Sequence, residues 1–416
     1  MLDIQFIREN PELVAKKAEE KHIKTDISRL LELDGQRREA LRVVEDLRKQ
    51  RNDNAEKMKN GQPSPELIEE GRRIKAQLNS ADEHLAGIET EYQELLWTVP
   101  NVTPDDTPLG GEEDNRPEKH WGDANEKDFT VIDHVTWGET RGLIDFERGA
   151  KVAGNKFYFL KGSLAQLDLA VMQMGMQLAV KHGLTPMLVP HMVTTRVASG
   201  TGFLPRGEER QIYKIEGEDL NLIATAEMPI TGYHADETFD QKDLPLLYVG
   251  LSPSYRMEAG AYGKHARGLY RVHQFNKLEM YVFCKPEDSE EWHQKLIAIE
   301  EELCHMLEIP YRLVRIAAGD LGAPAYKKFD VEYWSPVDKT YRELMSCSNV
   351  TDYQARRLNI RYRTEDGHTR FVHTLNGTAA AMSRIPIALI ENHQQADGRV
   401  ILPEALRPYM SGQTEL

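Results

Sequence analysis

Residues 67–95 read LIEEGRRIKAQLNSADEHLAGIETEYQEL, and this stretch determines the architecture of the N-terminal part of the chain. Apolar and small side chains recur within it at alternating steps of four and three residues, the heptad pattern of a coiled coil. The stretch is therefore predicted to form one long amphipathic helix. The positions that carry the pattern are Leu67, Gly71, Ile74, Leu78, Ala81, Leu85, Ile88, Tyr92 and Leu95.

A second helical pattern begins near Ile27, and the Gly- and Pro-containing segment 60–66 separates it from the first. A short loop makes two such helices antiparallel neighbours, so we predict a hairpin about 45 to 50 Å long at ~1.5 Å per residue. Residues before Ile27 are expected to form a small helical base, with a helix start at Asn10-Pro11-Glu12. Leu30, Leu33, Ala40, Val44, Leu47 and Met58 follow one stripe, which Arg37, Arg51 and Asn54 interrupt.

The outgoing helix of this hairpin is basic in an acidic protein. The chain carries a net charge of −15, whereas residues 37–60 hold eight basic and five acidic side chains, a balance of +3. A surface that contacts phosphates is one interpretation. A solvated coiled-coil face, or an arm for oligomerisation or spacing, is the alternative. The candidate phosphate contacts on this helix are Arg37, Arg38, Arg42, Arg48 and Lys49.

Composition restricts the class of protein further. The length of 416 residues allows two or three domains, and 40% hydrophobic with 29% charged residues is typical of a soluble globular chain. Three scattered cysteines predict neither a disulfide framework nor a zinc site of the CxxC type. The first ten residues do not resemble a secretory signal, and the segment 164–180 is too polar to span a bilayer. We expect a cytoplasmic protein with no membrane contact.

The remainder of the chain predicts an α+β domain. Residues 98–122, rich in Pro and Gly, are expected to be a linker without packed structure, so the expected domains are 1–100 and 101–416. Strands are predicted near 157–160, 187–190, 244–250, 268–283 and 312–316, and helices at 164–181, 288–307 and 377–393. Closely spaced strands without regular βαβ alternation indicate an antiparallel sheet. No phosphate-binding P-loop motif is present.

Charged side chains gather in one predicted strand. Alternation along residues 270–280 places Arg271, Phe275 and Glu279 on one face, together with His273 and Lys277. With Arg256 from the preceding strand, such a cluster is costly unless a charged ligand neutralises it. A surface salt-bridge ladder is the alternative interpretation.

Three other segments contain candidate site residues. Residues 374–384 are small and end in Arg384, whose planar guanidinium suits phosphate oxygens, although a buried arginine bonded to carbonyls would give the same pattern. Glu343 and Ser346 offer a carboxylate and a hydroxyl three residues apart, which suits Mg²⁺ bound with a substrate phosphate, or an ordinary strand end. The triplet 225–227 says little by itself.

In this order and spacing, these segments resemble the bacterial-type seryl-tRNA synthetases, a family of class II aminoacyl-tRNA synthetases, over essentially the whole length. Residues 183–190, 256–279 and 376–384 resemble the three class II motifs, and the start MLDIQFIRENPE with the helical hairpin resembles the tRNA-binding arm. Residues 225–227 and 343–349 resemble segments of the seryl enzymes. The resemblance implies an antiparallel-sheet catalytic domain, a homodimer, ATP and L-serine as substrates, and Mg²⁺.

The same resemblance implies roles for individual residues. Catalytic cations would be Arg256, Arg271 and Arg384, of which Arg256 would bind the α-phosphate and Arg384 the γ-phosphate. Metal ligands would be Glu343 and Ser346. ATP contacts would be Arg256, Met257, Glu258, Val272, Phe275, Glu343, Leu344, Met345, Ser346 and Arg384. Serine contacts would be Thr225, Ala226, Glu227, Arg256, Glu279, Asn376 and Thr378.

Three alternatives stand beside a serine–tRNA ligase. An amino acid:carrier-protein ligase on the same core would lack the arm that this chain keeps. A non-catalytic RNA-binding paralogue would have lost arginines such as Arg256, Arg271 and Arg384, which are all present. An inhibitor-resistant duplicate enzyme remains open, and so does the charging of tRNA(Sec) in addition to tRNA(Ser).

Overall fold

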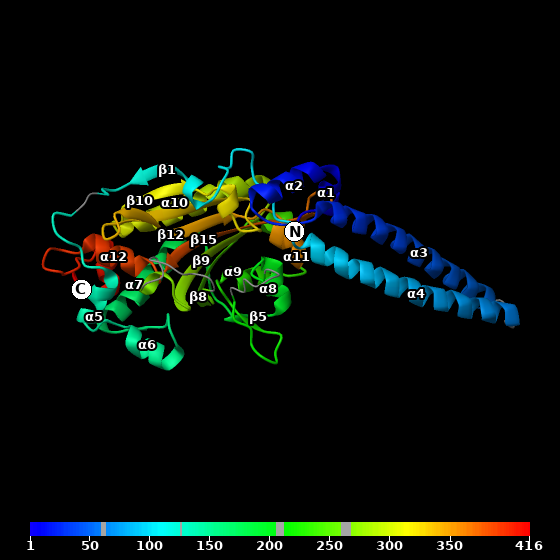
Figure 1. Cartoon of the computed structure of the whole chain (residues 1–416), viewed down its shortest axis with the longest axis horizontal. Helices are drawn as coiled ribbons and strands as arrows, with labels where there is room; N and C mark the ends of the chain where they lie inside the picture. The colour runs from blue at the N-terminus through cyan, green and yellow to red at the C-terminus, as the bar shows by residue number, and fades with distance from the viewer. Residues whose placement is uncertain (60–63, 125–126, 205–211, 259–267) are drawn as a thin grey trace. The chain divides into compact units, whose positions relative to one another are not determined.

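The computed structural model of the chain describes residues 1–59, 64–124, 127–204, 212–258 and 268–416 (Figure 1). The chain divides into two compact units, Met1–Val102 and Thr103–Leu416, called here the arm unit and the sheet unit. No helix in these described ranges is long and apolar enough to cross a membrane.

The arm unit is a helical hairpin on a small helical base, as the sequence predicts. α1 (Ile4–Glu9) and α2 (Pro11–Glu20) form the base, and α3 (Ile27–Lys59) and α4 (Pro65–Leu96) run side by side as the hairpin (Figure 1). The heptad pattern is confirmed, because its central side chains are buried between the two helices. At the C-terminal end Leu96 is buried more deeply than the predicted Leu95. The buried side chains of α4 are Ile74, Leu78, Leu85, Ile88, Tyr92 and Leu96.

Asn54, one of the polar residues that interrupt the apolar stripe of α3, has a specific partner near the end of the hairpin. Asn54 is 5% exposed, and its Nδ2 donates to the carbonyl of Leu67 at 3.2 Å. Gly71 faces it, and a Cβ at that position would lie 2.9 Å from Asn54 Nδ2. The absence of a side chain at Gly71 therefore makes room for the Asn54 amide in the apolar contact. Ser64 caps the start of α4 by accepting from the Leu67 N–H at 3.3 Å.

The sheet unit is built around an eight-stranded sheet in the order β1-β10-β11-β12-β15-β9-β8-β4. All neighbouring strands are antiparallel except β4 and β8, which are parallel. This agrees with the predicted α+β class. The strands are β1 (Arg116–Trp121), β4 (Thr185–Leu188), β8 (Leu246–Tyr255), β9 (Gln274–Cys284), β10 (Tyr311–Arg315), β11 (Lys327–Ser335), β12 (Thr340–Asn349) and β15 (His373–Ala381).

Three smaller sheets accompany the large one. They pair β2 (Ile144–Asp145) with β3 (Phe159–Leu160), β5 (Met192–Val193) with β6 (Asn221–Leu222), and β13 (Arg361–Arg363) with both β14 (Thr369–Phe371) and β7 (Thr238–Asp240).

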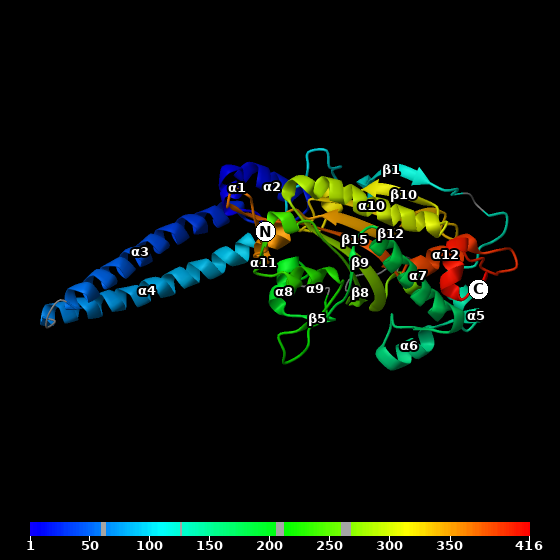
Figure 2. The ribbon, with the colours of Figure 1, turned by 180° about the vertical axis from the view of Figure 1, so that it is seen from behind.

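Helices cover both faces of the large sheet (Figure 2). On one face α7 (Gly162–Lys181), α10 (Ser289–Met306) and α12 (Ile385–His393) enclose the main core with strand residues such as Leu278 and Met280. On the other face Tyr281 and Phe283 pack in a second core with α8 (Thr195–Thr201), α9 (Glu227–Tyr233) and α11 (Tyr353–Leu358). Two short helices, α5 (His134–Thr140) and α6 (Phe146–Ala153), precede α7.

Three predictions of local structure were wrong. Residues 116–121 of the expected linker form β1, which pairs with β10 at the sheet edge. Residues 377–381 are strand and not helix, because they are buried and continue β15 alongside β9, where sheet pairing overrides the helix propensity of alanine. The strand expected from residue 268 begins at Gln274, after a 3₁₀ turn at Gly268–Tyr270.

Candidate active site

The predicted site residues converge on one face of the large sheet. A small cavity of about 60 Å³ lies where β8, β9, β12 and β15 end or begin, and it contains most of the charged groups singled out in the sequence. Its lining residues are Arg256, Glu258, Tyr270, Arg271, Val272, Phe275, Lys277, Glu343, Leu344, Ser346, Thr378, Ala381, Ser383 and Arg384.

Arg256 enters the cavity because it directly follows β8. Its backbone N–H donates to the carbonyl of His273 at 2.9 Å, which continues the β8–β9 hairpin beyond the strands. The guanidinium lies over the ring of Phe275, 5.3 Å from its centroid. An aromatic face beside a cation provides a stacking surface next to an anion site.

Arg384 and Glu343 form an ion pair inside the cavity. Arg384 immediately precedes α12, and its Nη1 lies 2.6 Å from Oε1 of Glu343 on β12. Burial alone would raise the pKa of Glu343, but Arg384 and Lys328 hold it at about 2. The pKa of Arg384 is raised above its usual value because Glu343 outweighs the effect of burial.

The cations of the cavity repel one another. Burial, and then the charge of Arg384, lowers the pKa of Arg256. A second ion pair joins Arg271 Nη1 to Glu258 Oε2 at 3.2 Å. Three guanidinium groups confined with few counter-charges form a site suited to a multiply charged anion such as a triphosphate.

A buried carboxylate pocket adjoins this cavity. Glu227, at the start of α9, accepts from Gln354 Nε2 at 2.7 Å and from Asn376 Nδ2 at 3.1 Å. Burial, and then the nearby charge of Glu279, raises the pKa of Glu227 to about 7. Glu279 is 1% exposed and pairs with Lys277 along β9. Such a pocket can accept the ammonium group of a small amino acid.

The other predicted serine contacts surround this pocket. Thr225 Oγ1 accepts from the backbone N–H of Glu227 at 3.3 Å, and Ala226 precedes α9 as a fully buried residue. Thr378 lies opposite Glu279 in the β15–β9 register and also lines the charged cavity. Thr378 therefore connects the two halves of the site.

Two predicted ATP contacts are not among the residues that line the cavity. Met345 is 1% exposed and belongs to the main core, because alternation along β12 turns its side chain away from Ser346. Met257 is not among the residues that line the cavity.

Several side chains at the site had no assigned role in the sequence. Tyr270 donates to the carbonyl of Glu343 at 3.2 Å, and its ring lies 5.0 Å from the guanidinium carbon of Arg384. Lys277 lies on the strand face that the alternation along residues 270–280 predicts, so the sequence did contain a signal for this residue. Gln354 lies on α11, where no local pattern marks it. Asp330 is paired with Lys328 at 3.0 Å and faces Ser346 across β11 and β12.

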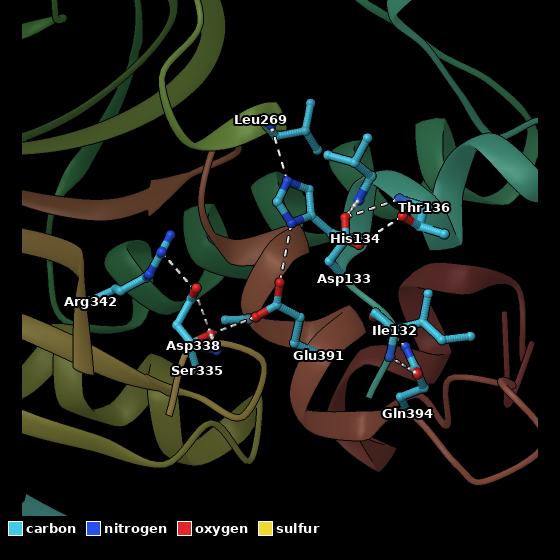
Figure 3. A network of polar contacts seen from close by, with 12 residues as sticks. Ile132, Asp133, His134, Thr136, Leu269, Ser335, Asp338, Arg342, Glu391 and Gln394 are labelled. Atoms are coloured by element: carbon cyan, nitrogen blue, oxygen red, sulfur yellow. Dashed lines mark hydrogen bonds and ion pairs between the residues drawn. The ribbon is translucent and has the colours of Figure 1, made fainter. Parts of the chain in front are cut away.

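A buried polar network fixes the segment that carries Tyr270 (Figure 3). His134 Nε2 accepts from the backbone N–H of Leu269 at 3.2 Å, so its Nδ1 carries the proton that it donates to Glu391, 3.2 Å away. Ser335 also donates to Glu391, at 2.9 Å. Asp338 lies beside Ser335 and pairs with Arg342 at 2.6 Å. The network holds the 3₁₀ turn Gly268–Tyr270, which precedes β9.

The predicted metal ligands, Glu343 and Ser346, lie three residues apart on β12. Glu343 and Ser346 both line the cavity, but among the described residues no group of three or more His, Cys, Asp or Glu side chains could hold a metal by itself. A carboxylate and a hydroxyl suit Mg²⁺ only when phosphate oxygens complete the shell. The donor set thus fits an ion that enters together with a nucleotide.

Most of the predicted tRNA-binding residues are ion-paired within the arm unit. Arg37 and Arg48 of α3 reach across to Glu89 and Asp82 of α4, at 3.2 Å in both cases. Arg38 and Arg42 pair within α3, with Asp34 at 3.4 Å and with Glu39 at 3.6 Å. Lys49 is exposed, and no acidic group in the described part of the arm pairs with it.

Comparison with known proteins gives the relationship. Residues 1–103 match the seryl-tRNA synthetase N-terminal domain, and residues 212–393 match the tRNA synthetase class II core domain (G, H, P, S and T). The serine–tRNA ligase of Rubrobacter xylanophilus is 46% identical over 99% of this chain and 98% of its own. That of Treponema denticola is 46% identical over 98% of both chains.

Solved structures agree with this. The seryl-tRNA synthetase of Pyrococcus horikoshii, crystallised with ATP, superposes with a TM-score of 0.91 at 41% identity, covering 100% of this chain and 99% of its own. The cytoplasmic serine–tRNA ligase of Naegleria fowleri, in complex with AMP, gives 0.84 at 31% identity, with 100% and 98% covered. The chain therefore belongs to the seryl-tRNA synthetase family of class II aminoacyl-tRNA synthetases.

Proposed function

We propose that this protein is a serine–tRNA ligase that activates L-serine with ATP and transfers it to the 3′ end of tRNA(Ser). The observation that carries the proposal is the convergence of Arg256, Arg271 and Arg384 beside the buried carboxylates Glu227 and Glu279 on one sheet face. Triphosphate and ammonium groups would find complementary charges there within a single site.

In the first step a serine carboxylate oxygen attacks the α-phosphorus of ATP, the bond to the bridging oxygen of the β-phosphate breaks, and pyrophosphate leaves. Negative charge gathers on the phosphoryl oxygens, so positioned cations matter more than a protein base. Arg256 would stabilise the α-phosphate and Arg384 the leaving pyrophosphate, while Phe275 stacks on the purine. Mg²⁺ held by Glu343 and Ser346 would add further positive charge at the phosphates.

Serine would be selected by hydrogen bonding. Glu279 would accept the ammonium group, and Thr378 with the Glu227 network would surround the hydroxyl. A substrate without the hydroxyl would leave these buried polar groups unpaired, which disfavours alanine. The arm unit would hold tRNA by its backbone, with Lys49 as a cation that needs no internal pair to be broken.

A homodimer is part of the proposal. Apolar side chains are exposed along α7, β4 and β5, including Leu169 at 69% and Leu188 at 84% exposure. β4 is also the last strand of the large sheet, so its outer edge is free to pair. Exposed apolar side chains near a strand edge are suited to contact with a second copy of the chain.

The carrier-protein ligase alternative is not favoured, because the chain retains the seryl N-terminal domain. We further infer a reducing, cytoplasmic setting, since the three cysteines Cys284, Cys304 and Cys347 are buried and unpaired.

Pyrophosphate exchange tests the proposed activity. Folded protein with Mg²⁺ and ATP should show exchange with serine, and much weaker exchange with threonine, alanine or glycine. Absence of exchange with every amino acid would refute the ligase function, and exchange driven best by another amino acid would refute serine as its substrate.

A further inference from the structure

A carboxyl group lies buried directly behind the site, and the proposed mechanism does not use it. Glu300 belongs to α10, which covers the face of the sheet opposite to the charged cavity, and its side chain is 0% exposed. Its Oε2 has no hydrogen-bond partner among the described residues. A fully buried carboxyl with an unpaired oxygen is costly, so its presence calls for an explanation beyond packing.

Within the part of the chain that the structure describes, Glu300 bonds to a residue of the site. The backbone N–H of Thr378 on β15 donates to Glu300 Oε1 at 2.8 Å. Thr378 also lines the cavity, and its side-chain hydroxyl donates to the carbonyl of Ser346 at 3.4 Å. Thr378 is therefore bonded to α10 through its backbone, while the residue also lines the charged cavity.

The sheet explains why this N–H needs a partner from outside. The pairing of β12 with β15 runs from Asn349–Leu375 to Cys347–Gly377 and ends there. On the other edge, the register of β15 against β9 shifts between Thr378 and Ala380. Thr378 thus lies where the regular ladder stops on one side and is irregular on the other, and the Glu300 carboxyl replaces the missing strand acceptor.

Gly377, the neighbour of Thr378, leaves room for the Glu300 carboxyl. A Cβ at Gly377 would lie 3.3 Å from Glu300 Oε1 and 3.4 Å from Cys347 Sγ, tighter than ordinary contact for the oxygen. Burial raises the pKa of Glu300 well above its usual value, because a charged carboxyl is costly in this surrounding.

We propose that Glu300 is a positioning residue, which holds the backbone of Thr378 so that its side chain stands in the serine pocket opposite Glu279. This inference rests on the proposed function, because it assigns Glu300 to the binding of the amino acid and not to that of ATP.

Three variants in the full-length protein test the inference. Glu300→Gln keeps the accepting oxygen and the volume, whereas Glu300→Met keeps the volume and removes the acceptor. Glu302→Met is the matched control, since Glu302 lies on the same helix but pairs at the surface with Lys181 and His182. Pyrophosphate exchange gives KM for serine and for ATP, and hydrogen–deuterium exchange follows the peptide that contains Thr378.

Glu300→Met should raise KM for serine about tenfold, the effect of one lost buried hydrogen bond, while KM for ATP stays within about twofold. The Thr378 peptide should exchange faster in this variant only. Glu300→Gln should restore both properties, and Glu302→Met should match the unaltered protein. The split between the two KM values separates positioning from a general loss of folding.

Two results would overturn the inference. An unchanged KM for serine in Glu300→Met, with an active unaltered protein, refutes the role of Glu300 and leaves the proposed function intact. Equal rises in both KM values, or no rescue by Glu300→Gln, also refute it. No serine-dependent exchange in the unaltered protein refutes the proposed function and the pocket role together.

Discussion

Nη1 of Arg384 lies 2.6 Å from Oε1 of Glu343, so the two groups proposed to bind the γ-phosphate and Mg²⁺ neutralise each other in the structure. A phosphate that binds Arg384 removes the counter-charge of Glu343, and a cation at Glu343 removes that of Arg384. A buried Arg384 or Glu343 left without an opposite charge is costly, and the second ligand supplies that charge. Nucleotide binding and metal binding should therefore each strengthen the other.

Glu343→Gln tests this relationship. The amide cannot balance Arg384 or provide an anionic metal ligand, so exchange should fall about 100-fold and require more Mg²⁺. The measurement is the exchange rate over a Mg²⁺ titration. Glu332→Gln is the control, since Glu332 pairs with Arg312 on β10 and does not line the cavity. An unaltered Mg²⁺ dependence would remove Glu343 from the metal site.

Arg256→Ala should separate activity from stability. Loss of a charge-stabilising donor should slow exchange by about 2 kcal/mol, roughly thirtyfold. The melting temperature should not fall with it, because burial and Arg384 already disfavour the charge on Arg256. Exchange kinetics and thermal unfolding of the same preparation measure the two effects. A near-normal rate would contradict the role of Arg256.

The raised pKa of Glu227 predicts a pH-dependent stability. Between its usual value of 4.5 and about 7 in the folded protein, the unfolded chain is ionised while the folded one stays protonated, so stability is lost as pH rises through this range. Glu227→Gln removes this loss of stability, which reaches about 3 kcal/mol at pH values above the range. Its melting temperature should equal that of the unaltered protein near pH 4.5 and exceed it near pH 8. A difference that does not change with pH would rule this out.

Lys49→Glu should weaken tRNA charging without affecting exchange. The reversal places an anion where a phosphate contact is proposed, so kcat/KM for tRNA should fall and the salt dependence of binding should become shallower. Arg37→Ala is the comparison, because Arg37 is already paired with Glu89 and should contribute less. If exchange fell as much as charging, the arm would not be acting through tRNA.

The helical hairpin was predictable because its heptad pattern repeats along the sequence. Four heptads specified α4 and its buried side chains, since burial along one helix face is a local property of the sequence. β15 shows the opposite case. Ala379, Ala380 and Ala381 favour a helix by themselves, and only their burial beside β9 makes them strand residues. No local pattern contains that information.

The site divides in the same way. Arg256, Arg384 and Glu343 were identifiable because charges stand out among apolar strand residues, and the structure places all three at one cavity. Gln354 and Glu300 were not, because each acts on the site through a partner that is distant in sequence. Gln354 bonds Glu227 from 127 positions away, and Glu300 bonds Thr378 from 78.

The contact of Asn54 with Leu67 and Gly71 has a mechanical consequence for the arm unit. If α3 slid along α4, the Asn54 amide would meet apolar side chains and lose its bond to the Leu67 carbonyl, while Gly71 would no longer accommodate it. The hairpin is thereby locked in one alignment and keeps a constant length. The distance between its base helices and its far end is then set by the number of residues in α3 and α4, and contact with a partner does not change it.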